Sequence, residues 1–519
     1  MTPSDNWSPF SAMGISNRDR AAHGALILMA VFAFAWAVAR AYVQSVVGDE
    51  AAAYFGFATG AHQWYPAAAN HLLNEMIVQV FTSIFGLSPL TLRAGALIGA
   101  AIFIVSAYWL CRMISREWLI RLPLFSCLVY NPYVFDFFVA SRGYGLALAF
   151  LLAAIAFSAW SQMEQRPILG CASASLCIGL SFTANFAFAL ADAALLLLIF
   201  LWAMRSGRIS CAGERWRLIA ASLSPALIVV ILIPSSTLLD WPKGLLAIGT
   251  DSIRETILSA MKATLYQLNP HIVNPLLLAR VSRLKRFLLP AFWAAVLFHI
   301  TMARIDWGKL RTAENQWRAA LSIITGGAAA LALLLHWAAF VCFGLRLPLD
   351  RTAVFFAPLC TVMAGSAVAI PARSQAGTWS RRVAIGMLFV MAVYFASCMR
   401  LTYFREWQYI AEAKQAYFAA AYFNHTRCAQ KVYSSWYYES ALEFYRTVNP
   451  HERFSSFMID VKYPVDRQLY VLNVIFDSDF IRTQRLTMVY HGETTDIGVF
   501  LSPSLAVPPE RACDAALLP

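Results

Sequence analysis

Residues 23–43 read HGALILMAVFAFAWAVARAYV and contain one formal charge, at Arg40. An α-helix needs about 20 mostly apolar residues to cross roughly 30 Å of hydrocarbon. Inside lipid the backbone polar groups must be paired within the segment, so a run of this kind is helical. The run is too long for a signal-peptide core and lacks a small-residue cleavage site, so we expect a retained first membrane span.

Comparable apolar runs recur along the chain. Of its 519 residues, 59% are hydrophobic and 13% are charged, whereas soluble domains carry about 25% charged residues. We therefore predict an α-helical polytopic membrane protein with about eleven transmembrane helices. The predicted spans lie at 21–43, 91–113, 118–136, 143–160, 168–183, 184–204, 217–239, 287–303, 319–343, 353–370 and 383–403.

The distribution of basic residues predicts the orientation. The formal net charge is +12, and arginines cluster in short gaps between apolar runs, as at 112–121 and 205–217. Alternate gaps share this enrichment, which is the positive-inside pattern of cytoplasmic loops. We predict a bacterial inner-membrane protein with a cytoplasmic N-terminus. Membrane topology accounts for the charge, so we expect no nucleic-acid partner.

The composition changes after Arg400. Residues 404–519 are polar and rich in Tyr, with a helical pattern at 405–423 and strand patterns at 431–436, 467–475, 486–491 and 497–502. We predict a transmembrane domain at 1–403, with a catalytic first outer loop at 44–90. We predict a soluble α/β domain at 404–519, which an odd number of spans places in the periplasm.

Two of the ten cysteines, Cys428 and Cys513, fall in this predicted outer domain. The periplasm is oxidising. We therefore predict that these two cysteines form a disulfide.

The first outer loop holds the most informative polar residues. Asp49 and Glu50 directly follow the first span. Such a pair can simply be a solvated helix start, since carboxylates favour helix N-termini. The loop continues into an apolar-faced segment, 71–85, too polar to span, and Arg93 opens the next span. On that segment the spacing places four polar side chains on one face: Asn70, His71, Asn74 and Glu75.

Three more charged residues lie at predicted outer ends of spans: Asp136, Arg142 and Arg351. The two arginines break the positive-inside trend, and either contact a ligand or reach to lipid headgroups. An acid at membrane depth is a functional candidate, although Asp136 can equally pair with Arg142. A basic run at 280–286 either binds a lipid phosphate or contacts anionic headgroups.

Several short motifs occur in an order typical of one superfamily. They are Asp49-Glu50, NHLLN at 70–74, Phe85-Gly86 to Leu92-Arg93, SRGY at 141–144 and LPLDRT at 347–352. With these motifs the sequence resembles the C-type glycosyltransferases, polytopic enzymes that take a sugar from a polyprenyl-phosphate carrier. The pattern is most similar to the bacterial protein-mannosyltransferase-like and aminoarabinose-transferase-like branches. Many relatives carry Lys-Pro-Pro in the first loop, where this chain has Ala69-Asn70-His71.

The resemblance implies an inverting transfer with Asp49 as general base and Glu50 as helper or second choice. It implies a polyprenyl-phosphate-linked sugar as donor, membrane lipids as surroundings, and a glycan, glycolipid or protein as acceptor. The candidate contacts to the donor phosphate or sugar are Asn70, His71, Asn74, Glu75, Arg93, Asp136, Arg142, Tyr144 and Arg351.

No certain cofactor follows from the sequence. No Cys/His cluster has zinc spacing, and the chain has no P-loop or nucleotide-binding glycine motif, which fits a lipid-linked donor. Asp49, Glu50 and Glu75 could share a divalent cation, as in some C-type transferases. Two rival functions are a transporter or lipid flippase, although no pair of Gly- or Pro-broken spans indicates one, and a non-catalytic membrane scaffold.

Overall fold

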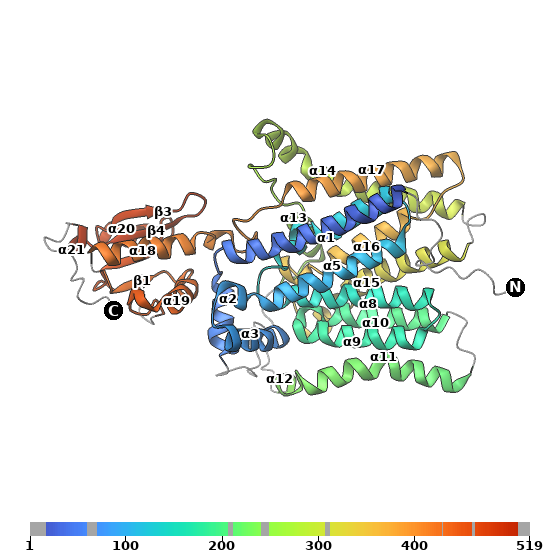
Figure 1. Ribbon diagram of the computed structural model, residues 1–519, viewed down its shortest axis with the longest axis horizontal. Coiled ribbons are helices and arrows are strands. Elements are labelled where there is room, and N and C mark those ends of the chain that lie inside the picture. Colours follow the sequence, from blue (N-terminus) through green and yellow to red (C-terminus); the bar gives the residue numbers. More distant parts are fainter. Residues whose placement is uncertain are drawn as a thin grey trace. The chain divides into compact units, whose positions relative to one another are not determined.

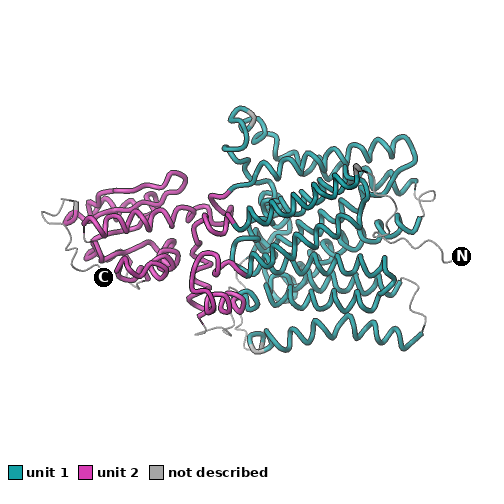
Figure 2. Tube along the Cα trace, viewed as in Figure 1, with its two compact units in different colours: residues 1–38, 64–74, 95–400 teal, residues 39–63, 75–94, 401–519 magenta. Residues whose placement is uncertain are grey.

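The computed structural model describes residues 17–59, 70–205, 211–239, 249–306, 312–427, 429–458 and 462–506. The chain forms two compact units, shown in Figure 2. Unit 1 comprises residues 1–38, 64–74 and 95–400, and unit 2 comprises residues 39–63, 75–94 and 401–519. The domain boundaries at 1–403 and 404–519 stay a prediction. Segments of the first outer loop belong alternately to unit 1 and unit 2.

Long apolar helices that run side by side make up most of unit 1 (Figure 1). Ten helices of the described residues, two of them extended by short turns, are long and apolar enough to cross a membrane. The polytopic helical fold is therefore confirmed. The ten helices are α1 (Asn17–Val43), α5 (Ala94–Ile114), α8 (Tyr144–Met163), α9 (Pro167–Ala184), α10 (Ala189–Arg205), α11 (Ala212–Leu232), α14 (Pro275–Ile305), α15 (Ala313–Phe343), α16 (Phe356–Val368) and α17 (Gln375–Ser397).

The third predicted span, 118–136, is divided into two helices. Helix α6 (Trp118–Val129) has 12 residues, about 18 Å at roughly 1.5 Å per residue. The Asn131 side chain then accepts a hydrogen bond from the Tyr133 amide at 3.1 Å, and α7 (Pro132–Asp136) begins with a proline. A capping Asn followed by Pro is a strong start signal for a new helix, which is why one long helix does not form.

This broken segment still returns the chain through unit 1. Gly99, early in α5, approaches Gly145, at the start of α8, so closely that a Cβ on Gly99 would lie 2.7 Å from the Gly145 carbonyl carbon. Both helices therefore begin at the same end of the unit, and residues 115–143 lead back between them. The eleven predicted passes correspond to the ten long helices and the shorter α6.

The segment between the predicted spans at 217–239 and 287–303 is partly helical. It contains α13 (Ile253–Thr264), and α14 begins at Pro275, about a turn and a half before the basic run at 280–286. Asn274 caps this helix by accepting from the Leu276 amide at 2.9 Å. The basic residues thus lie on the first turns of α14 and not in a loop, which corrects the predicted start of this span. Shorter elements in unit 1 are η2 (Phe186–Phe188), α12 (Ser235–Leu239) and η4 (Asp350–Ala353).

Unit 2 begins with the first outer loop. It contains α2 (Gly48–Ala53), the π-helical turn η1 (Tyr54–Ala58), most of α3 (Leu72–Phe85) and α4 (Pro89–Leu92). The apolar-faced segment predicted at 71–85 forms helix α3. Asn70 and His71 lie just before its first residue, not on it.

The C-terminal part of unit 2 is an α/β fold, as predicted. Its strands pair in the order β1-β2-β4-β3; β1 is parallel to β2, and the other pairs are antiparallel. The predicted helix at 405–423 starts later, because residues 408–410 form a 3-10 turn. The elements are η5 (Gln408–Ile410), α18 (Ala413–Arg427), β1 (Val432–Ser434), α19 (Glu439–Val448), η6 (Pro450–Glu452), β2 (Leu469–Asn473), α20 (Ser478–Thr483), β3 (Thr487–His491), β4 (Ile497–Leu501) and α21 (Pro503–Ala506).

Both faces of the central strands are covered. Tyr470 and Leu472 of β2 pack with Phe480 and Ile481 of α20 on one face, while α18 lies against β2, β3 and β4. Alternate side chains of a strand point to opposite faces, so every residue of β2 and β4 is buried. The sheet provides a rigid base for the loops that follow its strands.

Candidate active site

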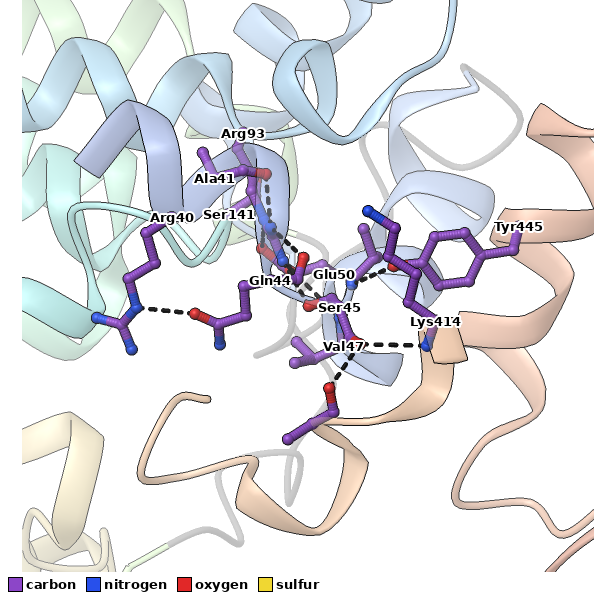
Figure 3. Close-up of polar contacts among 12 residues, drawn as sticks. Arg40, Ala41, Gln44, Ser45, Val47, Glu50, Arg93, Ser141, Lys414 and Tyr445 are labelled. Atoms are coloured by element: carbon purple, nitrogen blue, oxygen red, sulfur yellow. Dashed lines mark hydrogen bonds and ion pairs between the residues drawn. The ribbon is translucent and has the colours of Figure 1, made fainter. Parts of the chain in front are cut away.

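The acidic pair at the start of α2 is divided between two environments. Glu50 forms a two-pronged ion pair with Arg93, with Nη2 to Oε2 at 2.7 Å and Nε to Oε1 at 3.0 Å (Figure 3). Both side chains are 0% exposed. The Val47 amide also donates to Glu50 at 3.0 Å. Glu50 is thereby fixed by partners from its own loop.

The remaining N–H groups of Arg93 complete the end of α1. Its Nη1 donates to the carbonyls of Ala41 at 2.8 Å and Gln44 at 2.9 Å, and its Nη2 donates to that of Ser45 at 2.8 Å. The last carbonyls of a helix have no partner within it, and Arg93 supplies one. A guanidinium has five N–H donors, and these contacts use all five. The predicted phosphate contact of Arg93 thus has no N–H left to make it.

The C-terminal part of unit 2 packs against the same segment. The Tyr445 hydroxyl accepts from the Val46 amide at 2.8 Å, and the Ser45 hydroxyl donates to the Ala411 carbonyl at 2.6 Å. The Lys414 amide donates back to Ser45 Oγ at 3.1 Å. Helix α19 lies against α2. The start of the first outer loop is therefore held by residues almost 400 positions further along the chain.

Arg40 belongs to this network and was missed by the sequence reasoning. It is buried, donates to Gln44 Oε1 at 2.8 Å and to the Tyr403 carbonyl at 2.6 Å, and lies 4.8 Å from the centre of the Phe404 ring. A single arginine in the last turn of an otherwise uncharged span was the available signal.

Asp49 differs from its neighbour. It lies in the first turn of α2 and is half-buried, whereas Glu50 is fully buried. Adjacent residues on a helix point about 100° apart, so Asp49 faces a different direction from the Glu50–Arg93 pair. Of the two acids, Asp49 is the more exposed residue.

Unit 1 brings together the other end of the first loop and the predicted 141–144 motif. The Asn74 side-chain amide donates to Ser141 Oγ at 3.1 Å, and the rings of His71 and Tyr144 lie 5.8 Å apart. Gly143 has a left-handed backbone with φ 70°, and a Cβ there would lie 2.9 Å from the Cβ of His71. Glycine is required here both by its conformation and by this close approach.

His71 is buried next to two cations. Burial in the first place, and then the charges of Arg142 and Arg351, hold the pKa of His71 well below its usual range. The ring is therefore neutral at physiological pH. Its Nε2 makes no hydrogen bond with any residue that the structure describes. The charges of both arginines thus act on the same buried, neutral imidazole.

Asp136 is also placed in unit 1. The Tyr266 hydroxyl donates to its Oδ2 at 3.0 Å, and Asp136 is buried. The Tyr133 hydroxyl donates to the carbonyl of Asp350, next to Arg351. Tyr266 was not predicted as a partner of Asp136, since it lies 130 residues away.

The three acids considered for a divalent cation do not form a suitable site. No group of three or more His, Cys, Asp or Glu side chains that could hold a metal ion occurs in the described parts of the chain. Both oxygens of Glu50 already accept from Arg93, and Glu75 is buried.

Two predictions fall on residues outside the described ranges. They are the disulfide between Cys428 and Cys513 and the part of the predicted catalytic loop at 60–69. Both stay predictions.

No protein-family model and no curated protein sequence matches the chain. Its fold is nevertheless similar to that of solved membrane proteins. The crystal structure of ArnT from Cupriavidus metallidurans in the apo state has a TM-score of 0.53 and 12% sequence identity, covering 94% of this chain and 100% of that chain.

Two further structures are similar over most of this chain, each at 12% identity. ArnT from Cupriavidus metallidurans bound to undecaprenyl phosphate has a TM-score of 0.48 and covers 94% of this chain and 99% of its own. The archaeal oligosaccharyltransferase AglB from Archaeoglobus fulgidus, in complex with an inhibitory peptide and a dolichol-phosphate, has a TM-score of 0.39, covering 95% and 76%. From the match to apo ArnT, an aminoarabinose transferase, we conclude that this chain is a multi-pass membrane protein with the C-type glycosyltransferase fold.

Proposed function

We propose that this protein is a membrane glycosyltransferase that takes a sugar from a polyprenyl-phosphate-linked donor. Its acceptor is an envelope glycan, a glycolipid or a protein on the outer face of a bacterial inner membrane. The N-terminus lies in the cytoplasm in this proposal and the C-terminal domain in the periplasm. The ArnT-like fold supports the class of enzyme, and the residues at the start of α2 support the chemistry.

The proposed reaction is a single inverting displacement. The acceptor oxygen forms a bond to the anomeric carbon as the bond between that carbon and the phosphate oxygen breaks. The acceptor hydroxyl gives its proton to the Asp49 carboxylate, which acts as general base. The electron pair of the breaking bond leaves with the polyprenyl phosphate, which gains one negative charge. A single displacement needs no second carboxylate as nucleophile.

The observation that carries this proposal is the division between Asp49 and Glu50. Both oxygens of Glu50 accept hydrogen bonds from Arg93. Glu50 could therefore take a proton from the acceptor hydroxyl only by breaking a fully buried ion pair. Removing one partner of such a pair is costly, because the other charge is left unpaired. Glu50 and Arg93 therefore fix α2, and Asp49, which keeps an accessible surface, acts as the base.

The departing phosphate needs positive charge to stabilise it. We assign this role to Arg142 and Arg351, whose charges are strong enough at His71 to depress its pKa. His71 and Asn74 replace the Lys-Pro-Pro of many relatives as neutral hydrogen-bonding groups. We assign no phosphate contact to Arg93, because its five N–H groups all donate to protein oxygens.

The release of polyprenyl phosphate tests the proposal. The purified wild type, Asp49→Asn and the control Asp479→Asn, an exposed acid in the same unit, are each incubated with membrane lipid-linked sugars and an envelope extract. We expect release by the wild type and by the control. We expect loss of about 10²–10⁴-fold in rate for Asp49→Asn, the usual contribution of a general base.

Equal release by all three proteins would remove Asp49 from the role of base. No release by any of them, with acceptor present, would favour the transporter and scaffold functions. Translocation of lipid-linked sugar in proteoliposomes would then distinguish those two.

A further inference from the structure

The C-terminal part of unit 2 contains a pocket of about 470 Å³, within the range of small-molecule sites. It lies at the carboxyl ends of the parallel strands β1 and β2. In α/β folds, ligands bind in the crevice beyond the carboxyl ends of the strands. Six of its lining residues carry the argument: Ser434, Trp436, Tyr437, Glu439, Phe476 and Asp477.

One wall of the pocket is an aromatic platform. Trp436 is 71% exposed and Phe476 is 70% exposed. The rings of Trp436 and Tyr437 lie 4.0 Å apart, and Tyr437 stacks on Phe476 at 5.7 Å with 29° between the ring planes. Leaving two large rings in water forgoes the gain from burying them. Their exposure around a pocket indicates a flat surface that a ligand covers.

Polar side chains also line the pocket. Ser434 is 2% exposed, and its hydroxyl makes no hydrogen bond with any residue of the described ranges. A buried polar group without a partner costs free energy. A ligand hydroxyl at this point would supply the missing hydrogen bond.

Asp477 holds other hydroxyl groups in place at the pocket. The Tyr463 hydroxyl donates to its Oδ1 at 2.6 Å, and the Asn473 amide donates to its Oδ2 at 2.8 Å. Ser435 also donates to Oδ2. With Glu439 also in the lining, the pocket carries two negative charges and the hydroxyl oxygens of serine and tyrosine side chains, against one cation among its lining residues, Lys462.

This combination selects a class of ligand. A phosphate or a polyanion is repelled by the two carboxylates, and a purely apolar group leaves Ser434 without a partner. A sugar ring has an apolar C–H face that stacks on an aromatic ring and a rim of hydroxyls that hydrogen-bond to carboxylates and serines. We propose that this pocket binds a saccharide and that, in the proposed transferase, this saccharide is part of the acceptor.

The pocket is structurally connected to the candidate base within unit 2. A Cβ on Gly48 would lie 3.5 Å from the Tyr437 carbonyl oxygen, so the loop that carries the aromatic platform touches the residue before Asp49. Helix α19, which follows this loop, packs on α2. A saccharide held by Trp436 and Tyr437 is therefore bound to the same body that carries Asp49. This part of the inference rests on the proposed function; the saccharide site itself does not.

Binding of the purified full-length protein to an array of neutral, amino and acidic oligosaccharides of bacterial envelopes tests the pocket. We expect binding to a subset of these, competed by the same free sugar. Trp436→Ala and Phe476→Ala should each weaken binding at least tenfold. Tyr422→Ala, which removes an exposed aromatic ring of α18 outside the pocket, should leave it unchanged. Binding to no saccharide, or equal binding by all variants, would overturn the proposal.

Ser434→Ala separates a ligand contact from a structural role. The hydroxyl has no partner in the free protein, so its removal should leave the thermal midpoint unchanged or higher. The same change should weaken saccharide binding severalfold, because the ligand hydroxyl loses its partner. A lower thermal midpoint with unchanged binding would show that Ser434 serves the fold alone.

Asp49→Asn distinguishes this inference from the proposed function. It should bind saccharide like the wild type and yet fail to release polyprenyl phosphate. In the transfer assay, Trp436→Ala should raise the acceptor KM at least tenfold and leave the donor KM unchanged. Saccharide binding without any sugar transfer would support the saccharide pocket and contradict the proposed transferase function. Sugar transfer without saccharide binding would support the transferase function and contradict the saccharide pocket.

Discussion

At the start of the first outer loop, the charges of Glu50 and Arg93 neutralise each other in a buried pair, whereas further along the loop a neutral His71 is buried where the charges of two arginines act on it. The first region belongs to unit 2 and uses every N–H of Arg93 within the protein. In the second region, in unit 1, burial in the first place and then the charges of Arg142 and Arg351 lower the pKa of His71. The first outer loop thus contains two different polar regions. In one, every N–H of Arg93 is bonded within the protein; in the other, two arginine charges act on a neutral histidine.

This difference shows that an arginine at a predicted outer boundary is not by itself a ligand contact. Arg93, Arg142 and Arg351 looked alike in sequence. Arg93 serves as a helix cap and counter-ion, while the other two are the residues that we propose to stabilise an anionic leaving group. The comparison makes separate predictions for each region.

The largest effect is expected from Arg93→Met. The change leaves Glu50 as a buried charge without its partner and removes the cap of α1, so we expect a loss of about 3–5 kcal/mol in stability. The thermal midpoint in detergent measures it, with the exposed Arg482→Met as control. An Arg93→Met variant with normal stability but no activity would indicate that Arg93 contacts the donor phosphate, and would contradict its assignment to the fold.

Arg142→Met and Arg351→Met should act on catalysis more than on folding. A hydrogen bond to a charged group contributes about 1.5–3 kcal/mol, so each variant should lose about tenfold to a hundredfold in kcat/KM for the donor. Arg346→Met, which removes a half-exposed arginine of unit 1, is the control. Normal donor kinetics in both variants would mean that these arginines contact headgroups only.

The pH dependence of stability should report on His71. Its pKa is lower in the folded protein than in the unfolded chain, so the unfolded state binds more protons below about pH 6.5. Stability is fully present above that pH and is lost as the pH falls, by up to about 1.4 kcal/mol per pH unit. His71→Gln should flatten this slope in thermal midpoints measured from pH 7.5 to 5.5. An unchanged slope would show that His71 is not held neutral.

The smallest effect is expected from Tyr445→Phe. It removes the acceptor for the buried Val46 amide, at a cost of about 1–2 kcal/mol. Tyr422→Phe, at an exposed position, should cost nothing measurable. A neutral Tyr445→Phe would weaken the case that the C-terminal domain holds the start of the first loop.

Much of the fold could be predicted because its signals are local. The span at 23–43 is apolar over the length of a membrane, and the alternation at 467–475 indicates the strand β2. The break after α6 was also visible, since Asn131-Pro132 is a cap followed by a first-turn proline. It was overlooked because the apolar character of 118–136 continues across it.

The sequence indicates which residues belong to the candidate site, but not which of them contact each other. Asp49, His71 and Arg142 stand out as polar residues at span ends. The pairing of Glu50 with Arg93 joins residues 43 positions apart, and that of Val46 with Tyr445 joins residues 399 positions apart. No local pattern encodes such contacts, because they depend on how distant segments of unit 2 pack against one another. The saccharide pocket was visible only as a cluster of aromatic residues at 433–438, equally typical of a core.

The most direct test of the central claim compares the two adjacent acids in one experiment. Transfer rate per folded molecule and thermal midpoint are measured for the wild type, Asp49→Asn and Glu50→Gln. The account predicts that Asp49→Asn keeps the midpoint and loses about 10²–10⁴-fold in rate. It predicts that Glu50→Gln lowers the midpoint and that its folded fraction still transfers sugar. An active Asp49→Asn beside a stable but inactive Glu50→Gln would contradict it.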